Sequence, residues 1–247
     1  MERKQEILKI GNLDVYYGNK QVVSSISATY FSKDIVLLVG PNGAGKSTYL
    51  KSLAGILKHK NGKIYLNNKD ISNLPLEERV DKGILHLLQT ENVFSNYTVY
   101  ENLQMAGFFL DKMEFRKNVD KVFSLFPNLK DKKNRIAGLL SGGERQALAI
   151  SMILMRKPKI LLLDEPLAGL SPKTAQELII FLSNIFKFFP VEFICFVEHN
   201  LKLALQYSNR VQVLVQGRLN MDKYVNKNTD LKGLMGQIEK VYFGEVV

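Results

Sequence analysis

A glycine-rich run that contains a lysine and two hydroxyl residues is the first part of the chain that could do chemistry. It reads GPNGAGKST and fits the pattern G-x-x-x-x-G-K-[ST]. In that pattern backbone N–H groups approach phosphates closely, the lysine reaches the outer phosphates and the hydroxyl binds Mg²⁺. We expect Lys46 to neutralise charge on the β- and γ-phosphates, Ser47 to be a Mg²⁺ ligand and Thr48 to add a hydroxyl contact. The residues expected to hold the nucleotide are Gly40, Pro41, Asn42, Gly43, Ala44, Gly45, Lys46, Ser47 and Thr48.

Two acidic residues end a later apolar run that reads KILLLDEP. A lone acidic pair at the end of a strand is common, but a phosphate-binding loop elsewhere in the chain changes its meaning. Mg²⁺ prefers oxygen ligands and is often held by only one or two protein groups. We therefore expect Asp164 to bind Mg²⁺ directly or through water, and Glu165 to be the base that polarises the attacking water.

A third string, LSGGERQ, spans Leu140 to Gln146. Ser141 is a good helix N-cap, Glu144 follows three residues later as in a capping box, and Gly142 and Gly143 leave backbone N–H groups uncovered. Alone, the string predicts only a capped helix start. Together with the phosphate loop, it points to ATP hydrolysis at an interface between two copies of the chain.

The elements around these strings predict an α/β fold. Residues 34–40 form an apolar run that indicates a strand buried on both faces, as in a parallel sheet, and residues 46–57 follow as a helix. Residues 7–16 and 22–30 alternate like strands with one exposed face, joined by a turn at Gly18 and Asn19. Further expected strands cover 63–67, 84–88, 159–166, 191–199 and a hairpin at 210–221; further helices cover 74–83, 100–110, 114–126, 142–155, 174–189 and 231–243.

The fold class expected is a P-loop NTPase with a mostly parallel central sheet, an N-terminal antiparallel portion and an inserted helical subdomain. We expect a single domain over residues 1–247. Within it, residues 1–92 and 156–247 form the nucleotide-binding α/β core, and about 93–155 form the helical subdomain.

The composition limits the class of protein. The 247 residues are 46% hydrophobic, enough for a sizeable core, and the lone Cys195 permits no internal disulfide, which favours a reducing compartment. No apolar stretch approaches the roughly 18 residues of a membrane span, and the start of the chain shows no apolar signal core. The net charge of +10 comes from scattered lysines, so we expect no nucleic-acid partner.

The motifs, taken in order, resemble those of the nucleotide-binding subunit of an ABC (ATP-binding cassette) transporter. GPNGAGKST is similar to its Walker A loop, ILLLDEP to its Walker B strand and LSGGERQ to its signature. The resemblance implies that Gln89 senses Mg²⁺ as a ligand, that His199 contacts the γ-phosphate and holds the water, and that Tyr17 stacks on adenine. An ordinary strand position for Tyr17, with Tyr16 beside it, and a structural role for His199 stay open.

The resemblance also implies how such a chain works. Two subunits, either two copies of this chain or this chain and a second ABC ATPase, would pair head to tail. Each ATP would lie between Lys46 of one subunit and Ser141, Gly142 and Gly143 of the other. The pair would drive separate integral membrane subunits from the cytoplasmic face of the membrane. A soluble ABC ATPase acting in cofactor assembly or on nucleic acid is the alternative; Glu165 and His199 argue against a cassette that binds ATP without hydrolysing it.

Finer details point to particular groups of ABC ATPases. The AGLSP string, residues 93–109 and the ending VYFG resemble the branched-chain amino-acid and amide importer ATPases, and also the lipopolysaccharide-export ATPase. Many members have Asp where this chain has Ser171, so cross-subunit contacts of that Asp are in doubt. A docking surface for membrane subunits is expected beside Gln89, where apolar residues cluster, although internal packing explains them equally well: Val93, Phe94, Tyr97 and Tyr100.

Overall fold

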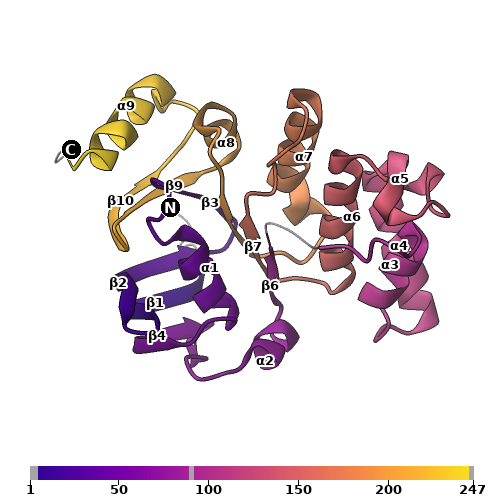
Figure 1. Ribbon diagram of the computed structural model, residues 1–247, viewed down its shortest axis with the longest axis horizontal. Helices are drawn as coiled ribbons and strands as arrows, with labels where there is room; N and C mark the ends of the chain where they lie inside the picture. The colour runs from indigo at the N-terminus through magenta and orange to yellow at the C-terminus, as the bar shows by residue number, and fades with distance from the viewer. Residues whose placement is uncertain (1–4, 89–91, 245–247) are drawn as a thin grey trace.

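The computed structural model describes residues 5–88 and 92–244, and its centre is a six-stranded sheet (Figure 1). Five strands run parallel, and the hairpin strand β10 pairs antiparallel with β9 at one edge. The order across the sheet is β10 (Arg218–Tyr224), β9 (Arg210–Val215), β3 (Asp34–Val39), β8 (Phe193–Val197), β7 (Ile160–Asp164) and β6 (Ile84–Leu87).

The central strands are apolar throughout because both faces of the sheet are covered. All six residues of β3 and all five of β7 and of β8 are buried. Alternate residues of β3 enter different cores: Leu37 and Val39 pack on one face, and Val36 and Leu38 pack on the other. This two-sided burial explains why the sequence shows continuous apolar runs here and not an alternating pattern.

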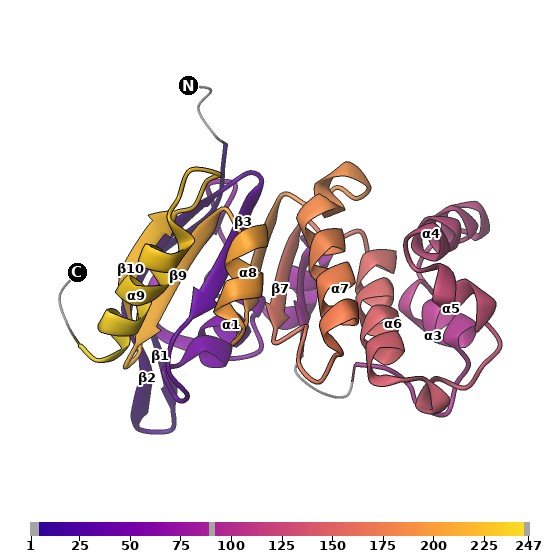
Figure 2. The same cartoon turned by 90° about the horizontal axis from the view of Figure 1, so that it is seen from above.

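A second sheet covers one face together with α1 (Lys46–Ala54). It is antiparallel, with the order β2 (Lys20–Phe31), β1 (Glu6–Tyr17), β4 (His59–Leu66) and β5 (Lys69–Asp70). The helices α7 (Pro172–Asn184), α8 (Leu201–Tyr207) and α9 (Leu231–Tyr242) belong to the core of the opposite face. Seen from above, these three helices and α6 lie in a row across the sheet (Figure 2).

The helical part lies beyond β6 and β7, at one end of the molecule (Figure 1). It consists of α3 (Val99–Ala106), α4 (Lys112–Leu125), α5 (Pro127–Asp131), a 3₁₀ turn at Ala137–Leu139 and α6 (Gly142–Met155). Helix α6 contacts β6 as well as α3, α4 and α5, so it connects this part to the sheet. A short helix, α2 (Leu76–Asp81), precedes β6.

Most expected elements are present, and the differences have local causes. The helix expected over 46–57 ends at Ala54, because Arg79 donates to the carbonyls of Ser52 and Leu53 and Gly55 takes a left-handed conformation. The helix expected over 174–189 ends at Asn184 and continues only as a 3₁₀ turn at Ile185–Lys187. Sequence reasoning missed α5, α8 and β5, which have seven residues or fewer and show little periodicity. Among the described residues, the helices are too short or too polar to span a bilayer.

Candidate nucleotide-binding and catalytic site

The loop between β3 and α1 has a backbone that only glycine fits at two positions. Gly45 precedes α1 with a φ of +103°, and a Cβ there would lie 2.9 Å from the carbonyl oxygen of Val22. A Cβ on Gly40 would lie 2.0 Å from the carbonyl oxygen of Leu214. The loop is therefore pressed between β2 and β9, and its glycines are required by space as well as by conformation.

The first turn of α1 is open to an anion. Within the described chain, no side chain caps this helix and no acidic residue lies in its first turn. The N-terminal N–H groups of a helix and its dipole together favour a negatively charged ligand. The predicted strand, glycine loop and helix are thus present in the expected order, and Ser47 and Thr48 both lie in this first turn.

Lys46 is held inside the same loop. The side chain is buried, and Nζ donates to the carbonyl oxygens of Gly40 at 2.8 Å and Pro41 at 3.1 Å. Burial lowers the pKa of Lys46, while the carboxylates of Glu165 and Asp164 raise it. The ammonium group is therefore already positioned over the loop; its hydrogen-bond partners among the described residues are two neutral carbonyls, and two acids lie nearby.

Asp164 ends β7 and contacts the hydroxyl of Ser47. Burial is the main cause that raises the pKa of Asp164, and the hydrogen bond with Ser47 opposes it. The residue is 3% exposed, and its Oδ1 has no hydrogen-bond partner among the described residues. A buried carboxylate oxygen without a partner, beside a hydroxyl at a phosphate loop, fits the oxygen ligands that Mg²⁺ prefers.

Glu165 and His199 come together because β7 and β8 are neighbours in the parallel sheet. Asp164 pairs with Val197, so the residues that follow the two strands leave the same edge. His199 Nε2 lies 3.0 Å from Glu165 Oε1. Glu165 has a φ of +51°, a conformation that is costly for a non-glycine residue and recurs at functional sites. Its N–H donates to the Val197 carbonyl at 3.1 Å.

The structure describes Tyr17, the residue expected to stack on adenine, but not Gln89, the residue expected to bind Mg²⁺. Tyr17 ends β1 with 48% of its surface exposed, and β2 returns from it towards Val22 at the phosphate loop. The neighbouring Tyr16 is less exposed, and Lys60 Nζ lies 4.9 Å from its ring centre. Tyr17 is therefore the tyrosine with the more available face. Gln89 lies outside the described residues.

The signature string begins α6 with the predicted capping box. The Glu144 N–H donates to Ser141 Oγ at 3.3 Å, and the Ser141 N–H donates to Glu144 Oε2 at 3.1 Å. Ser141 and Gly142 are exposed to solvent. A Cβ on Gly143 would lie 2.6 Å from Thr174 Cγ2 on α7, so this glycine permits close packing. Ser171 caps α7 through the Thr174 N–H, which gives this residue a local role where many family members have Asp.

The chain does not bring its signature string to its own phosphate loop. In both views β7 lies between α1 and α6 (Figures 1 and 2). The apolar residues expected as a docking surface also divide into two pairs. Phe94 and Tyr97 are each 46% exposed and pack edge to face, whereas Val93 and Tyr100 pack against the core. The surface interpretation thus fits one pair and internal packing fits the other.

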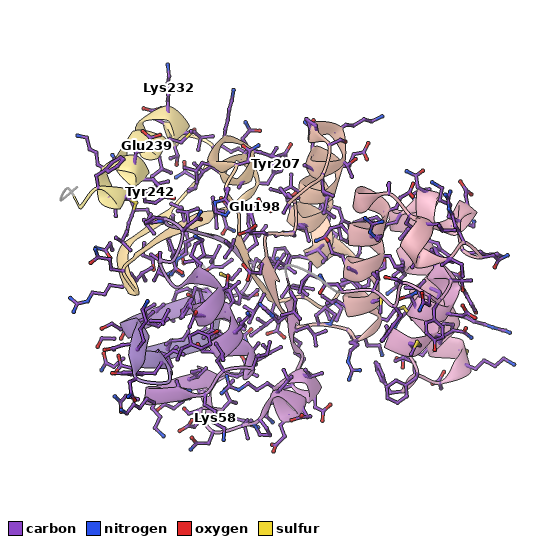
Figure 3. The ribbon with its side chains drawn as sticks, viewed as in Figure 1. Lys58, Glu198, Tyr207, Lys232, Glu239 and Tyr242 are labelled. Atoms are coloured by element: carbon purple, nitrogen blue, oxygen red, sulfur yellow. The ribbon has the colours of Figure 1, made fainter. Side chains whose placement is uncertain are left out.

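Sequence reasoning missed two polar residues close to the site. Glu198 follows β8 and accepts a hydrogen bond from the Leu167 N–H at 2.7 Å; Figure 3 shows it near the centre of the molecule, beneath α8 in that view. Tyr242, on α9, is hydrogen-bonded to the backbone of Gly40, and burial raises its pKa to about 12. A charged residue directly after the apolar run FICFV was the available signal for Glu198, whereas no local pattern indicates Tyr242.

The parallel sheet, the phosphate loop after β3 and the acidic pair at the end of β7 define a P-loop nucleoside triphosphatase. The ABC transporter family matches residues 23–168. The chain is 39% identical to a probable branched-chain amino acid transport ATP-binding protein, LivF, of Archaeoglobus fulgidus, over 90% of this chain and 93% of the relative. It is 32% identical to the lipopolysaccharide export system ATP-binding protein LptB of Haemophilus influenzae, over 97% and 98% of the two chains.

Solved structures agree with these relatives. A nucleotide-free ATP-binding cassette from an ABC transporter superposes with a TM-score of 0.85 at 27% identity, covering 98% of this chain and all of that one. An ATP-binding cassette of an ABC transporter in its ADP conformation gives a TM-score of 0.82 at 28% identity, with the same coverage. The chain therefore belongs to the ABC transporter family, as an ATP-binding subunit and an ATPase coupled to transport. The alternative of a soluble ATPase in cofactor assembly or on nucleic acid is not favoured.

Proposed function

We propose that this subunit hydrolyses ATP–Mg²⁺ at composite sites formed when two subunits pair head to tail. Each ATP lies between the phosphate loop around Lys46 of one subunit and Ser141, Gly142 and Gly143 of the other. One observation carries this proposal: the start of α6 is exposed to solvent, and β7 separates it from α1 of the same chain. A second copy of this chain completes the site, and a second ABC ATPase in its place would serve equally.

The residues around the phosphates have roles that their geometry supports. Ser47 and Asp164 would hold Mg²⁺, which would supply positive charge beside the β- and γ-phosphates. The family resemblance adds Gln89, which lies outside the described residues, as a third ligand. Lys46 leaves the carbonyls of Gly40 and Pro41 for the phosphate oxygens. Its charge is already in place, so little reorganisation accompanies the reaction.

Glu165 and His199 act on the attacking water. Glu165 accepts a hydrogen bond from this water and takes its proton as the water oxygen bonds to the γ-phosphorus. The bond from the γ-phosphorus to the oxygen that bridges the β- and γ-phosphates breaks in the same step, and ADP leaves with that oxygen. His199, 3.0 Å from Glu165, contacts the γ-phosphate and holds the water in line. At the other end of the nucleotide, the exposed ring of Tyr17 stacks on adenine.

The two parts of the chain have separate tasks in this scheme. Residues 1–92 and 156–247 are the core that binds the triphosphate, and residues 93–155 are the helical subdomain that carries the signature to the partner. Support comes from α6, a helix of this part that contacts the sheet strand β6. Movement of the helical part relative to β6 would couple the ATP site to a membrane subunit bound beside the helical part.

An apolar groove beside Leu88 is the surface that we propose for a membrane subunit. It lies between α2, β6, α3 and α6, and its lining includes six apolar side chains, Leu76, Leu85, Phe94, Met105, Met152 and Ile153. Glu77 and Asp81 border it on α2, and Arg156 follows α6 on the opposite side. A helix with one apolar face fits such a groove. The chain would then act on the cytoplasmic face of the membrane.

Mixing two defective variants tests the composite site. Lys46→Ala removes the phosphate contact, and Ser141→Asp keeps a capping side chain while placing a negative charge against the γ-phosphate. In a head-to-tail pair of the two variants, one site contains both defects and the other contains neither. Single-turnover hydrolysis should therefore return on mixing, although each variant alone is inactive. Sites formed within one chain predict no recovery.

A further inference from the structure

A buried carboxyl group lies directly behind the two residues proposed to act on water. Glu198 is 6% exposed and sits between β8 and His199. The pKa of Glu198 is raised to about 7, mainly by burial and also by the neighbouring Glu165, while the backbone N–H groups of Leu167 and His199 and the His199 side chain oppose the rise. Burying a carboxyl group costs free energy, so Glu198 needs contacts that compensate for this cost.

The contacts of Glu198 join two separate loops. Oε1 accepts a hydrogen bond from the Leu167 N–H at 2.7 Å. Glu198 directly precedes His199, whose backbone N–H also lowers the pKa of this carboxyl group. Leu167 lies two residues after Glu165, and His199 begins the loop on the neighbouring strand. One side chain therefore connects the segment that carries the proposed base to the segment that carries the proposed histidine.

The loop after β7 needs such a connection. Glu165 has the left-handed φ of +51°, and the turn that follows is closed by the Ala168 N–H, which donates to the Glu165 carbonyl at 3.1 Å. A strained residue of this kind keeps its conformation only when surrounding contacts fix it. The Leu167 N–H lies inside this turn, so the Glu198 carboxyl holds the turn from the side of β8.

We propose that Glu198 is a positioning residue, whose carboxyl group ties the turn of residues 165–168 to the start of the His199 loop. The tie keeps the Glu165 carboxylate and the His199 ring at hydrogen-bonding distance during ATP hydrolysis. The inference rests on the proposed roles of Glu165 and His199. Because the tied group is the backbone N–H donor of Leu167, the tie needs an acceptor oxygen and not a negative charge.

Two substitutions of similar size separate the acceptor from the space that it fills. Glu198→Gln keeps an acceptor oxygen without charge, and Glu198→Met removes the acceptor while filling about the same volume. We expect Glu198→Met to lower kcat by about 10- to 100-fold, since small misplacements of reacting groups cost up to roughly 10² in rate. The KM for ATP should change less than about threefold, and Glu198→Gln should keep kcat within about threefold of wild type.

A double-mutant cycle with His199→Ala distinguishes positioning from general damage. If Glu198 acts through His199 and Glu165, Glu198→Met should add less than about threefold to the loss caused by His199→Ala. Equal activity of Glu198→Met and wild type, or losses that multiply fully in the double variant, would overturn the inference. Loss of kcat in Glu198→Gln as large as in Glu198→Met would also overturn it, because the acceptor would then not be the decisive group.

The Glu165→Gln variant separates failure of this inference from failure of the proposed function. If Glu165→Gln turns over ATP normally, the assignment of the base is wrong and the role of Glu198 loses its basis. If Glu165→Gln is inactive while Glu198→Met is fully active, only the positioning role fails.

Discussion

Replacement of Lys46 by alanine should remove most of the affinity for ATP and little of the stability. The ammonium group is buried over the phosphate loop, with Nζ 2.8 Å from the Gly40 carbonyl oxygen and 3.1 Å from that of Pro41. The variant loses two hydrogen bonds, which destabilises the fold. It also loses a buried charge, and burial of this charge is unfavourable, as the lowered pKa of Lys46 indicates. These effects oppose each other, so the free energy of unfolding should change by no more than about 1 kcal/mol.

The loss of ATP affinity should exceed the change in the free energy of unfolding, because no other cation replaces the Lys46 ammonium group at the phosphates in the proposed site. Hydrogen bonds to charged groups contribute about 1.5–3 kcal/mol each, and Lys46 would make two, to the β- and γ-phosphates. Giving up the Gly40 and Pro41 carbonyls on binding cancels part of this gain. We therefore expect a net loss near 3 kcal/mol, or a weakening of roughly 10²-fold in Kd for ATP.

Isothermal titration calorimetry with ATP and Mg²⁺ measures this effect, and Lys58→Ala is the matched control. Lys58 is exposed beyond the opposite end of α1 and is labelled in Figure 3, so its removal changes the net charge equally without touching the loop. The control should bind ATP within about twofold of wild type, because salt screens distant charges. An affinity of Lys46→Ala within threefold of wild type would refute the proposed phosphate contact.

Three further predictions concern packing, a buried guanidinium and pH. Gly143→Ala should destabilise the fold by about 1–3 kcal/mol through its clash with Thr174 Cγ2, and Thr174→Ser should restore most of the loss in urea denaturation. Arg79→Lys should cost about 2–4 kcal/mol, since Arg79 is 2% exposed and donates to four backbone carbonyls that one ammonium group cannot all reach. For Glu198, folding raises the pKa from 4.5 to about 7, so its contribution favours the fold below pH 4.5 and is lost as pH rises through 7. The stability of Glu198→Gln relative to wild type should therefore rise by up to roughly 3 kcal/mol between pH 4.5 and 8.

Each of these three has a contrary outcome. If Gly143→Ala and the double variant Gly143→Ala/Thr174→Ser are equally stable, the contact with α7 is not the cause of the destabilisation. An Arg79→Lys protein as stable as wild type would show that water replaces the lost donors. A pH-independent difference between Glu198→Gln and wild type would show that Glu198 is already ionised without cost in the folded protein.

Sequence reasoning predicted the parts of the fold that follow from local patterns. The apolar run before the phosphate loop and the alternation in β1 and β2 gave the two kinds of sheet, and the capping box at Ser141 gave the start of α6. Gly55 is a local signal for the end of α1 at Ala54. The donor to the last helical carbonyls, Arg79, was not predictable, because it comes from a different element.

The parts of the site that consist of residues close together in the sequence were predictable from residue types. The order of strand, glycine loop and helix predicted the phosphate contacts, and the family resemblance named Glu165 and His199, which the structure places 3.0 Å apart. The left-handed backbone at Glu165 and the carboxyl group of Glu198 behind it depend on which strands are neighbours. Neither feature can be inferred before the fold shows that β7 and β8 are neighbouring strands.

The state of the Glu165→Gln variant in the presence of ATP and Mg²⁺ is the most direct test of the central claim. Gel filtration with light scattering should show a dimer that forms with ATP and persists, because the γ-phosphate is no longer cleaved, while phosphate release falls to background. Wild type should form this dimer only transiently. A variant that hydrolyses ATP at the wild-type rate, or that stays monomeric with ATP bound, would contradict the account.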